Sequence, residues 1–260
     1  MNGSGTNHLG ANLAFTKFLF VSPSADDDAA RTRLRAAAGI LGRGFFNDFE
    51  AEGKDAAPHE TIQFFVNDQS RDQPGLSGAR YVIQVSSKYR PRLQETEAEA
   101  RRRLQEYASV VALDGAVRNP QYTSAAMHAY AYKHAVTRQS GRLQRNVIIL
   151  PMSKSAEWWA KDPLDRHSYF YPSNGHGAPV KGHARAAEEG IPTIYRRLYY
   201  NPDGNGRENE FDFITYFECA DEHLATFERI RGALRDPAQN PEWQYVIEGP
   251  EWRGRRVLKW

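Results

Sequence analysis

Hydrophobic and polar residues alternate along several short segments of the chain, and this alternation predicts β-strands. In residues 13–21, apolar side chains occupy every second position from Leu13 to Val21, interrupted once by Lys17. A period of two is typical of a strand with one buried face. Residues 61–66 and 79–85 are rich in β-branched and aromatic side chains, which also favour strands. The first half of the chain therefore contains at least three predicted strands.

Two segments of the first half have a helical pattern instead. Ser24 and the aspartates at 26–28 suit the start of a helix that runs to about Gly42, because acidic groups stabilise the positive end of the helix dipole. Residues 91–111 have a Glu/Arg-rich face and an apolar stripe, as in an amphipathic helix. A further strand is predicted around residues 127–136.

The second half repeats this order of elements. The predicted elements are a strand at 145–150, a helix from 156, strands at 194–200 and 211–217 joined by a turn at 201–206, a helix at 221–234 and a candidate closing strand at 245–247. We therefore expect an α+β protein of two fused ferredoxin-like halves with antiparallel sheets packed together. The expected boundaries are residues 1–140 and 141–260.

Composition limits the classes of function. The chain has 260 residues, of which 40% are hydrophobic, so it can bury a substantial core. Its 34 basic and 32 acidic residues nearly cancel, which argues against a nucleic-acid partner, and the basic residues 253–256 are expected at a solvated end or a subunit contact. The single cysteine, Cys219, excludes an intrachain disulfide framework and is expected to serve in packing.

The N-terminal residues 1–11 are rich in Gly, Asn and Ser and lack the basic and apolar regions of a signal peptide. No segment approaches the roughly 18 consecutive apolar residues of a membrane span. We expect a cytoplasmic protein without a membrane partner.

Candidate chemistry is concentrated between Lys154 and Arg196. In residues 193–200 the alternation places Arg196 on an otherwise apolar face. A charge there is unfavourable unless it is paired or used, so Arg196 is a functional candidate, whereas Arg197 on the opposite face needs no such explanation. His183 precedes a short helix that Gly190 can close and that Pro192 prevents from continuing.

Several motifs resemble, in order and wording, the C-terminal half of the chlorite dismutase family of haem proteins. They are Lys-Ser-Ala-Glu-Trp-Trp at 154–159, His183, Tyr-Arg-Arg-Leu-Tyr-Tyr at 195–200 and Phe-Ile-Thr-Tyr-Phe-Glu at 213–218. In that family a helical histidine ligates the haem iron, and an arginine thirteen residues later stands over the distal face. The resemblance implies that His183 is the ligand and Arg196 the distal group. His167 and His176 lack this spacing and are second and third candidates.

The resemblance also implies roles for neighbouring residues. A glutamate late in the chain holds the ligating histidine; Glu242 is the best match and Gln239 the alternative. A carboxylate there would increase electron donation to the iron. The indoles of Trp158 and Trp159 would form an apolar wall beside His183, with Trp159 contacting haem. Lys154 would lie near the haem propionates, or at the surface. The aromatic and basic cluster at 128–134 either lines the pocket edge or forms a core strand.

The implied activity is that of a haem b oxidoreductase that converts chlorite, a small anionic substrate, to chloride and dioxygen through an oxoferryl/hypochlorite intermediate. Two alternatives are another haem enzyme of the superfamily, such as a coproheme decarboxylase or a biosynthetic oxidant, and a non-catalytic haem-binding protein. Leu150 stands where such decarboxylases use a tyrosine, which argues against that activity. The chain departs from the family in about ten extra residues between Trp159 and His183 and in Tyr200, which replaces a common histidine. A homo-oligomer, with a pentamer favoured, is also implied.

Overall fold

The computed structural model describes residues 15–25, 27–52, 60–67, 75–117, 135–173, 180–207 and 210–260. The first half contains β1 (Phe15–Pro23), α1 (Asp28–Leu41), β2 (Phe46–Asn47), η1 (Asp48–Glu50), β3 (Glu60–Val66), β4 (Tyr81–Ser87), α2 (Arg90–Leu104) and β5 (Ala108–Ala116). The second half contains β6 (Asn146–Lys154), α4 (Ala156–Ala160), α5 (Pro163–Ser168), α6 (Gly182–Ala187), η3 (Glu188–Gly190), β7 (Tyr195–Tyr200), β8 (Phe213–Cys219), η4 (Asp221–His223), α7 (Leu224–Arg235), η5 (Pro241–Tyr245), β9 (Val246–Glu248) and β10 (Trp252–Val257).

Each half has the strand order of a ferredoxin-like sheet, β3-β4-β1-β5 in the first and β7-β8-β6-β10 in the second. The halves join at two places, where Ala116 of β5 pairs with Tyr200 of β7 and where β10 pairs with β3. Because β10 bridges β6 and β3, the sheet closes on itself. The predicted α+β architecture of two ferredoxin-like halves is thus confirmed, whereas the boundary at residue 140 stays a prediction.

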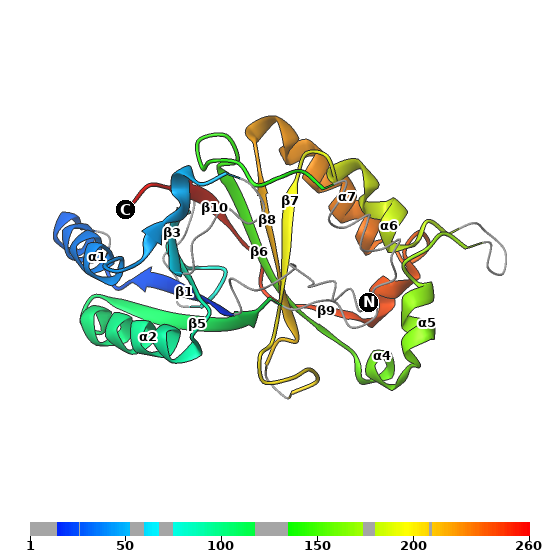
Figure 1. Ribbon diagram of the computed structural model, residues 1–260, viewed down its shortest axis with the longest axis horizontal. Coiled ribbons are helices and arrows are strands. Elements are labelled where there is room, and N and C mark those ends of the chain that lie inside the picture. Colours follow the sequence, from blue (N-terminus) through cyan, green and yellow to red (C-terminus); the bar gives the residue numbers. More distant parts are fainter. Residues whose placement is uncertain are drawn as a thin grey trace, which may run out of the picture.

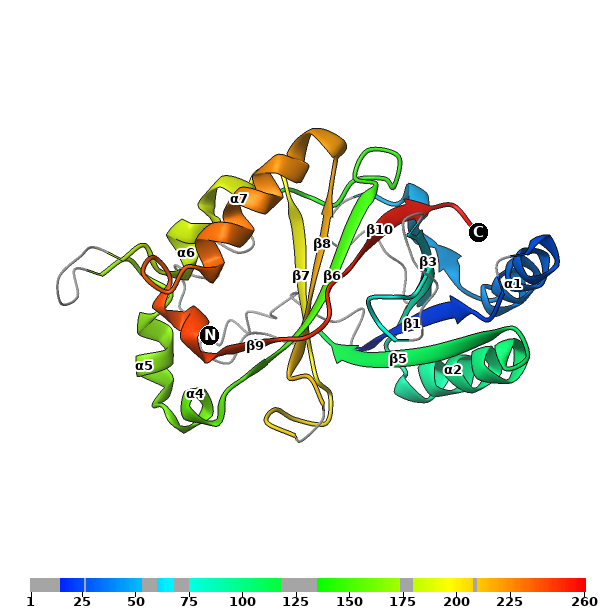
Figure 2. The ribbon, with the colours of Figure 1, turned by 180° about the vertical axis from the view of Figure 1, so that it is seen from behind.

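The sheets of both halves share one apolar interior, and helices cover their outer faces. Interior side chains come from alternate positions of strands in both halves and include Phe18, Phe65, Val147, Tyr216 and Trp252. Helices α1 and α2 lie at one end of the molecule and α4 to α7 at the other (Figure 1). The view from behind shows the same separation (Figure 2). The second group of helices therefore belongs entirely to the C-terminal half.

Two predicted element boundaries were wrong. The helix expected over residues 91–111 ends at Leu104, and Val110 and Val111 belong to β5, which pairs with β1 along its whole length. Pairing with a central strand outweighs helix propensity there. The closing strand is β10, not residues 245–247, which belong to η5 and β9; β9 pairs only with the end of β6. The strand expected at 127–136 lies almost wholly outside the described residues.

The basic residues 253–256 were expected at a solvated end or a subunit contact, but they lie in β10, where Arg256 is buried. Its guanidinium donates to Glu218 Oε2 at 2.9 Å. Arg138 donates to the other oxygen of Glu218 at 2.7 Å and also pairs with Asp48. These four charges, from η1, the 135–145 segment, β8 and β10, connect the two halves inside the fold. Arg256 is therefore a core residue because its charge is neutralised by Glu218.

The expectation that Cys219 serves in packing agrees with its position in the core. Cys219 is fully buried, and burial raises the pKa of its thiol to about 11. In the described part of the chain, no helix has the combination of length and apolar composition that a membrane span requires.

Candidate functional site

One face of the C-terminal sheet is turned toward α6 and α7. Ile148 of β6 and Cys219 of β8 pack together with Ile194 against Phe227 and Ile230 of α7. Since side chains alternate along a strand, the same face carries Leu150 and Lys154 on β6 and Arg196 and Leu198 on β7. The face is apolar over most of its length and carries one cationic residue on each of these two strands.

His183 is held on α6 by contacts at the start of that helix. Gly182 has φ +66°, and a Cβ there would lie 2.5 Å from the carbonyl oxygen of Tyr171, so only glycine fits. The Gly182 N–H donates to Gln239 O at 3.0 Å, and the His183 N–H donates to Tyr169 O at 3.2 Å. The imidazole stacks on Phe170, with ring centroids 6.0 Å apart. The backbone hydrogen bonds therefore hold the start of α6, and Phe170 packs against the His183 ring.

Glu242, on η5, contacts His183. Its Oε2 lies 3.2 Å from His183 Nδ1, and its Oε1 accepts a hydrogen bond from Lys154 Nζ at 2.6 Å. Burial alone would raise the pKa of Glu242, but Lys154 and His183 outweigh burial and hold the pKa well below its ordinary value. Glu242 is therefore a carboxylate at neutral pH. Gln239, the alternative partner, instead donates its side-chain amide to Asp236 at 2.7 Å.

Lys154 is buried, so the interpretation of it as a surface lysine was wrong. Its ammonium is engaged by Glu242 and lies 4.2 Å from the ring centre of Trp158. Burial lowers the pKa of Lys154, and the Glu242 carboxylate partly opposes that shift. The observed partner of Lys154 is thus Glu242, and a role at the propionates stays a prediction. We call His183, Glu242 and Lys154 the His-Glu-Lys triad.

The two tryptophans point to different neighbours, because successive residues of a helix are turned by about 100°. Trp158 is 1% exposed and packs on Tyr169 and Tyr245, with ring centroids 5.5 and 5.6 Å away. Trp159 donates from Nε1 to Asp212 Oδ2 at 3.1 Å. Trp158 is therefore the indole that contacts Lys154 of the His-Glu-Lys triad, and the haem contact expected of Trp159 stays a prediction.

Arg196 lies on the predicted strand and face, but its side chain is exposed. In register it is opposite Phe217 of β8, which packs on Phe227 of α7. No hydrogen bond or ion pair joins Arg196 to another of the described residues. Arg197 is the more buried of the two arginines, and it donates to the Tyr195 hydroxyl at 3.1 Å. Arg196 thus lies on the predicted face with Ile194 and Leu198, but its exposed guanidinium does not carry the cost of burial that made it a functional candidate.

Of the two other histidine candidates, the structure describes only His167. His167 lies on α5, with its ring 5.1 Å from that of Tyr171. His176 and the cluster at 128–134 lie outside the described residues. Sequence reasoning missed Asp212, which is 1% exposed and accepts hydrogen bonds from the Trp159 indole and from the backbone N–H of Lys154 at 2.7 Å. A carboxylate directly before the apolar strand at 213–219 was the available signal.

Comparison with known proteins supports the same fold. No protein-family model matches the chain. Among solved structures, an arginine-to-lysine mutant of chlorite dismutase from Candidatus Nitrospira defluvii has a TM-score of 0.68 and 20% identity, covering 96% of this chain and 93% of that one. The imidazole complex of the same enzyme has a TM-score of 0.65 and 20% identity, covering 94% and 91%.

The chain has the chlorite dismutase fold. The match covers nearly the whole of both proteins, so it includes the N-terminal half, where the sequence resembles the family only in pattern. At this level of identity the likeness concerns the fold, and the chemistry has to be argued from the residues described above.

Proposed function

We propose that the protein is a haem b oxidoreductase of the chlorite dismutase type, which converts chlorite to chloride and dioxygen. The observation that carries the proposal is the contact between His183 Nδ1 and the Glu242 carboxylate, 3.2 Å apart, with Arg196 on the same side of the sheet. Haem would supply the iron-centred exchange of oxygen with the substrate.

The residues fit a haem with one protein ligand. A carboxylate at Nδ1 favours the imidazole tautomer that carries its proton there, and this leaves Nε2 with a lone pair for iron. The imidazole is partly accessible, with 23% of its side chain exposed. Phe170 stacks against the ring and restricts its rotation. These are the requirements of an axial histidine.

Glu242 and Lys154 set the properties of that ligand. The carboxylate accepts a hydrogen bond from Nδ1–H, which makes the imidazole a stronger electron donor. Lys154 keeps the carboxylate ionised in a buried position and prevents it from rotating away, since it holds the other oxygen at 2.6 Å. The triad therefore holds the imidazole in one orientation, with Nδ1 facing the Glu242 carboxylate.

Arg196 would bind the anionic substrate. A guanidinium is charged at any working pH and offers several N–H donors. Because the Arg196 side chain is exposed, its donors could reach chlorite and the hypochlorite released from it. Holding hypochlorite close would allow its remaining oxygen to leave as part of dioxygen.

A coproheme decarboxylase is the second candidate. It is less favoured because the position of the required tyrosine is Leu150, which is 4% exposed on β6. A leucine side chain cannot lose an electron and a proton to form a radical. The nearby Tyr200 is also buried, but it lies on β7, not at that position.

The test has two parts. A pyridine haemochrome spectrum measures whether the protein binds one haem b per chain, and an oxygen electrode measures dioxygen released from chlorite. We expect stoichiometric haem and catalytic oxygen release. Conversion of coproheme to haem b without oxygen release would support the second candidate, and a protein without haem would contradict both.

A further inference from the structure

Three aromatic residues, Trp158, Tyr169 and Tyr245, lie beside the His-Glu-Lys triad. Trp158, which contacts Lys154, packs on both Tyr169 and Tyr245, and these two rings lie 5.7 Å apart. Their hydroxyl groups are 3.3 Å apart. The indole is buried, whereas both tyrosines are only half-buried. The three rings are therefore packed in a row that leads from the interior, next to the triad, to the protein surface.

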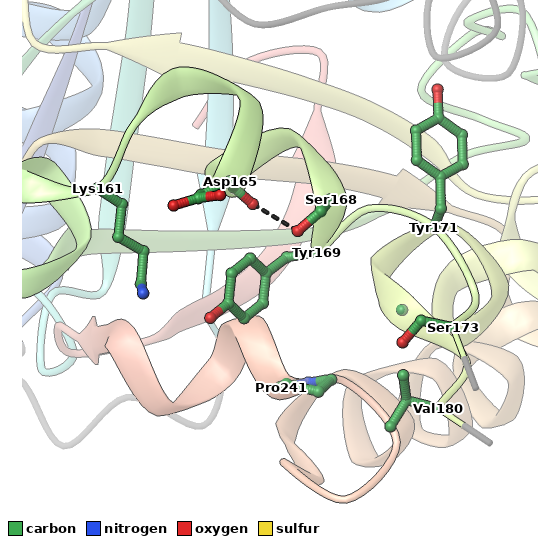
Figure 3. A pocket seen from close by; sticks show the side chains of 9 residues that line it. Lys161, Asp165, Ser168, Tyr169, Tyr171, Ser173, Val180 and Pro241 are labelled. Carbon is green, nitrogen blue, oxygen red and sulfur yellow. Dashed lines mark hydrogen bonds between the residues drawn. The ribbon is translucent and has the colours of Figure 1, made fainter. Parts of the chain in front are cut away.

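A pocket of about 340 Å³ lies at the outer end of this contact. Tyr169 forms part of its wall, together with Lys161, Asp165, Ser168 and Val180. In Figure 3 the Tyr169 hydroxyl is directed toward η5, while the Tyr171 hydroxyl points away from Tyr169. The pocket thus combines an aromatic wall with the cationic Lys161 and the acidic Asp165, and its size is sufficient for a single aromatic ring.

We propose that Trp158, Tyr169 and Tyr245 form a one-electron path between the haem site and this pocket, and that the pocket binds a small phenol as the electron donor. The inference rests on the proposed haem function. It adds a peroxidase activity in which the donor does not enter the haem site.

Side chains of tryptophan and tyrosine can lose one electron, and transfer is fast between groups in contact because its rate falls steeply with distance. The Lys154 ammonium, 4.2 Å from the indole centre, would oppose loss of an electron from Trp158. Glu242 offsets this effect, since its carboxylate lies 2.6 Å from the same ammonium. The indole is thus next to a neutralised ion pair and not an isolated cation.

The reaction balances with hydrogen peroxide as the oxidant. Two phenol molecules each lose one electron and the hydroxyl proton and become phenoxyl radicals. The two electrons pass along the tyrosines and Trp158 to the haem site, and the peroxide O–O bond breaks. The two protons combine with the two oxygens, which already carry two protons, to give two waters.

The test uses the haem-loaded full chain and a Tyr169→Phe/Tyr245→Phe double variant. Phenylalanine retains the packing on Trp158 but is not oxidised under these conditions. After addition of hydrogen peroxide, we expect rapid-freeze EPR to show a tyrosyl radical in the wild type and at least a fivefold weaker one in the double variant. Guaiacol oxidation should fall about tenfold, while the Soret band and oxygen release from chlorite are unchanged.

Tyr171→Phe is the matched control, because Tyr171 lines the same pocket but its ring contacts His167 and Phe170 and not Trp158. It should keep both the radical signal and guaiacol oxidation. An unchanged radical and unchanged guaiacol oxidation in the double variant would overturn the path, as would an equal loss in Tyr171→Phe. Because peroxide is the oxidant, these results are separate from a failure to release oxygen from chlorite, which would concern the proposed function instead.

Discussion

The Nδ1 atom of His183 lies 3.2 Å from Oε2 of Glu242, although the two residues are on different elements, α6 and η5. The backbone supports this contact, because the Gly182 N–H donates to the carbonyl of Gln239, three residues before the glutamate. The segment that follows α7 is thereby tied to the start of α6. The histidine and its carboxylate are positioned together.

Replacing the ligand should remove haem. His183→Ala is expected to abolish the stoichiometric Soret band because it removes the imidazole that Glu242 orients and that would ligate the iron. His167→Ala, on α5, is the control and should bind haem normally. The reverse result would show that the family alignment is wrong across the extra residues between Trp159 and His183.

Replacing the carboxylate should weaken the ligand but leave it in place. Glu242→Gln is expected to lower haem affinity or oxygen release by about 10–100-fold, since partners of ligating histidines typically contribute that much. The iron–histidine stretching frequency in resonance Raman spectra should also decrease. Glu248→Gln, which alters an exposed carboxylate paired with Arg235, should change neither quantity. An unchanged stretching frequency in Glu242→Gln would rule out electron donation through this contact.

Removing the proposed anion-binding group should affect turnover more than haem binding. Arg196→Ala is expected to bind haem normally, to release oxygen from chlorite at least about 100-fold more slowly, and to bleach sooner because hypochlorite escapes. The measurement is oxygen-electrode turnover beside a hypochlorite trap. Arg185→Ala, an exposed arginine of α6 paired with Glu188, is the matched control. Equal turnover in Arg196→Ala and wild type would exclude this role.

Gly182 allows the turn that presents His183. Gly182→Ala places a Cβ against the carbonyl of Tyr171 in a left-handed backbone conformation, at a cost of about 1–2 kcal/mol before any clash. We expect weaker haem binding and a lower midpoint in urea. Gly232→Ala is the comparison, because a Cβ at this position of α7 meets no atom within 4 Å. It should be neutral or slightly stabilising. Equal haem affinity in the two variants would contradict the proposed constraint.

The buried charges around Glu218 predict an acid-sensitive fold. Burial would raise the pKa of Glu218, but Arg138 and Arg256 hold the pKa below its ordinary value. A carboxyl group with a lowered pKa stabilises the folded state above its unfolded pKa, near 4.3, and this contribution is lost as the pH falls through the folded pKa. Asp48, whose pKa is raised mainly by burial, acts in the opposite direction.

Glu218→Gln should therefore lower the free energy of unfolding at pH 7 by about 3–5 kcal/mol, because two buried guanidinium groups lose their shared carboxylate. Its stability should also depend less on pH below 4.3 than that of the wild type. Urea unfolding at several pH values measures both effects. The exposed Glu222→Gln is the control, and identical pH profiles for all three proteins would contradict the prediction.

Local patterns in the sequence were sufficient to predict most strands and the two ferredoxin-like halves. Alternation depends on neighbouring residues, and the same alternation decides which side chains of a strand face the core. It placed Arg196 on the same face as Ile194, Leu198 and Tyr200. It could not show that Arg196 is exposed, because exposure depends on how far the helices extend over that face.

Tertiary structure decided the contacts between residues distant in sequence. The sequence left Glu242 and Gln239 as alternatives for the partner of His183. Only the folding of η5 against α6 distinguishes them. Likewise, Lys154 and Arg256 are of residue types that are usually exposed at the surface. Both are buried because the fold brings a carboxylate, Glu242 or Glu218, to each of them, and no local pattern records a partner 88 or 38 residues away.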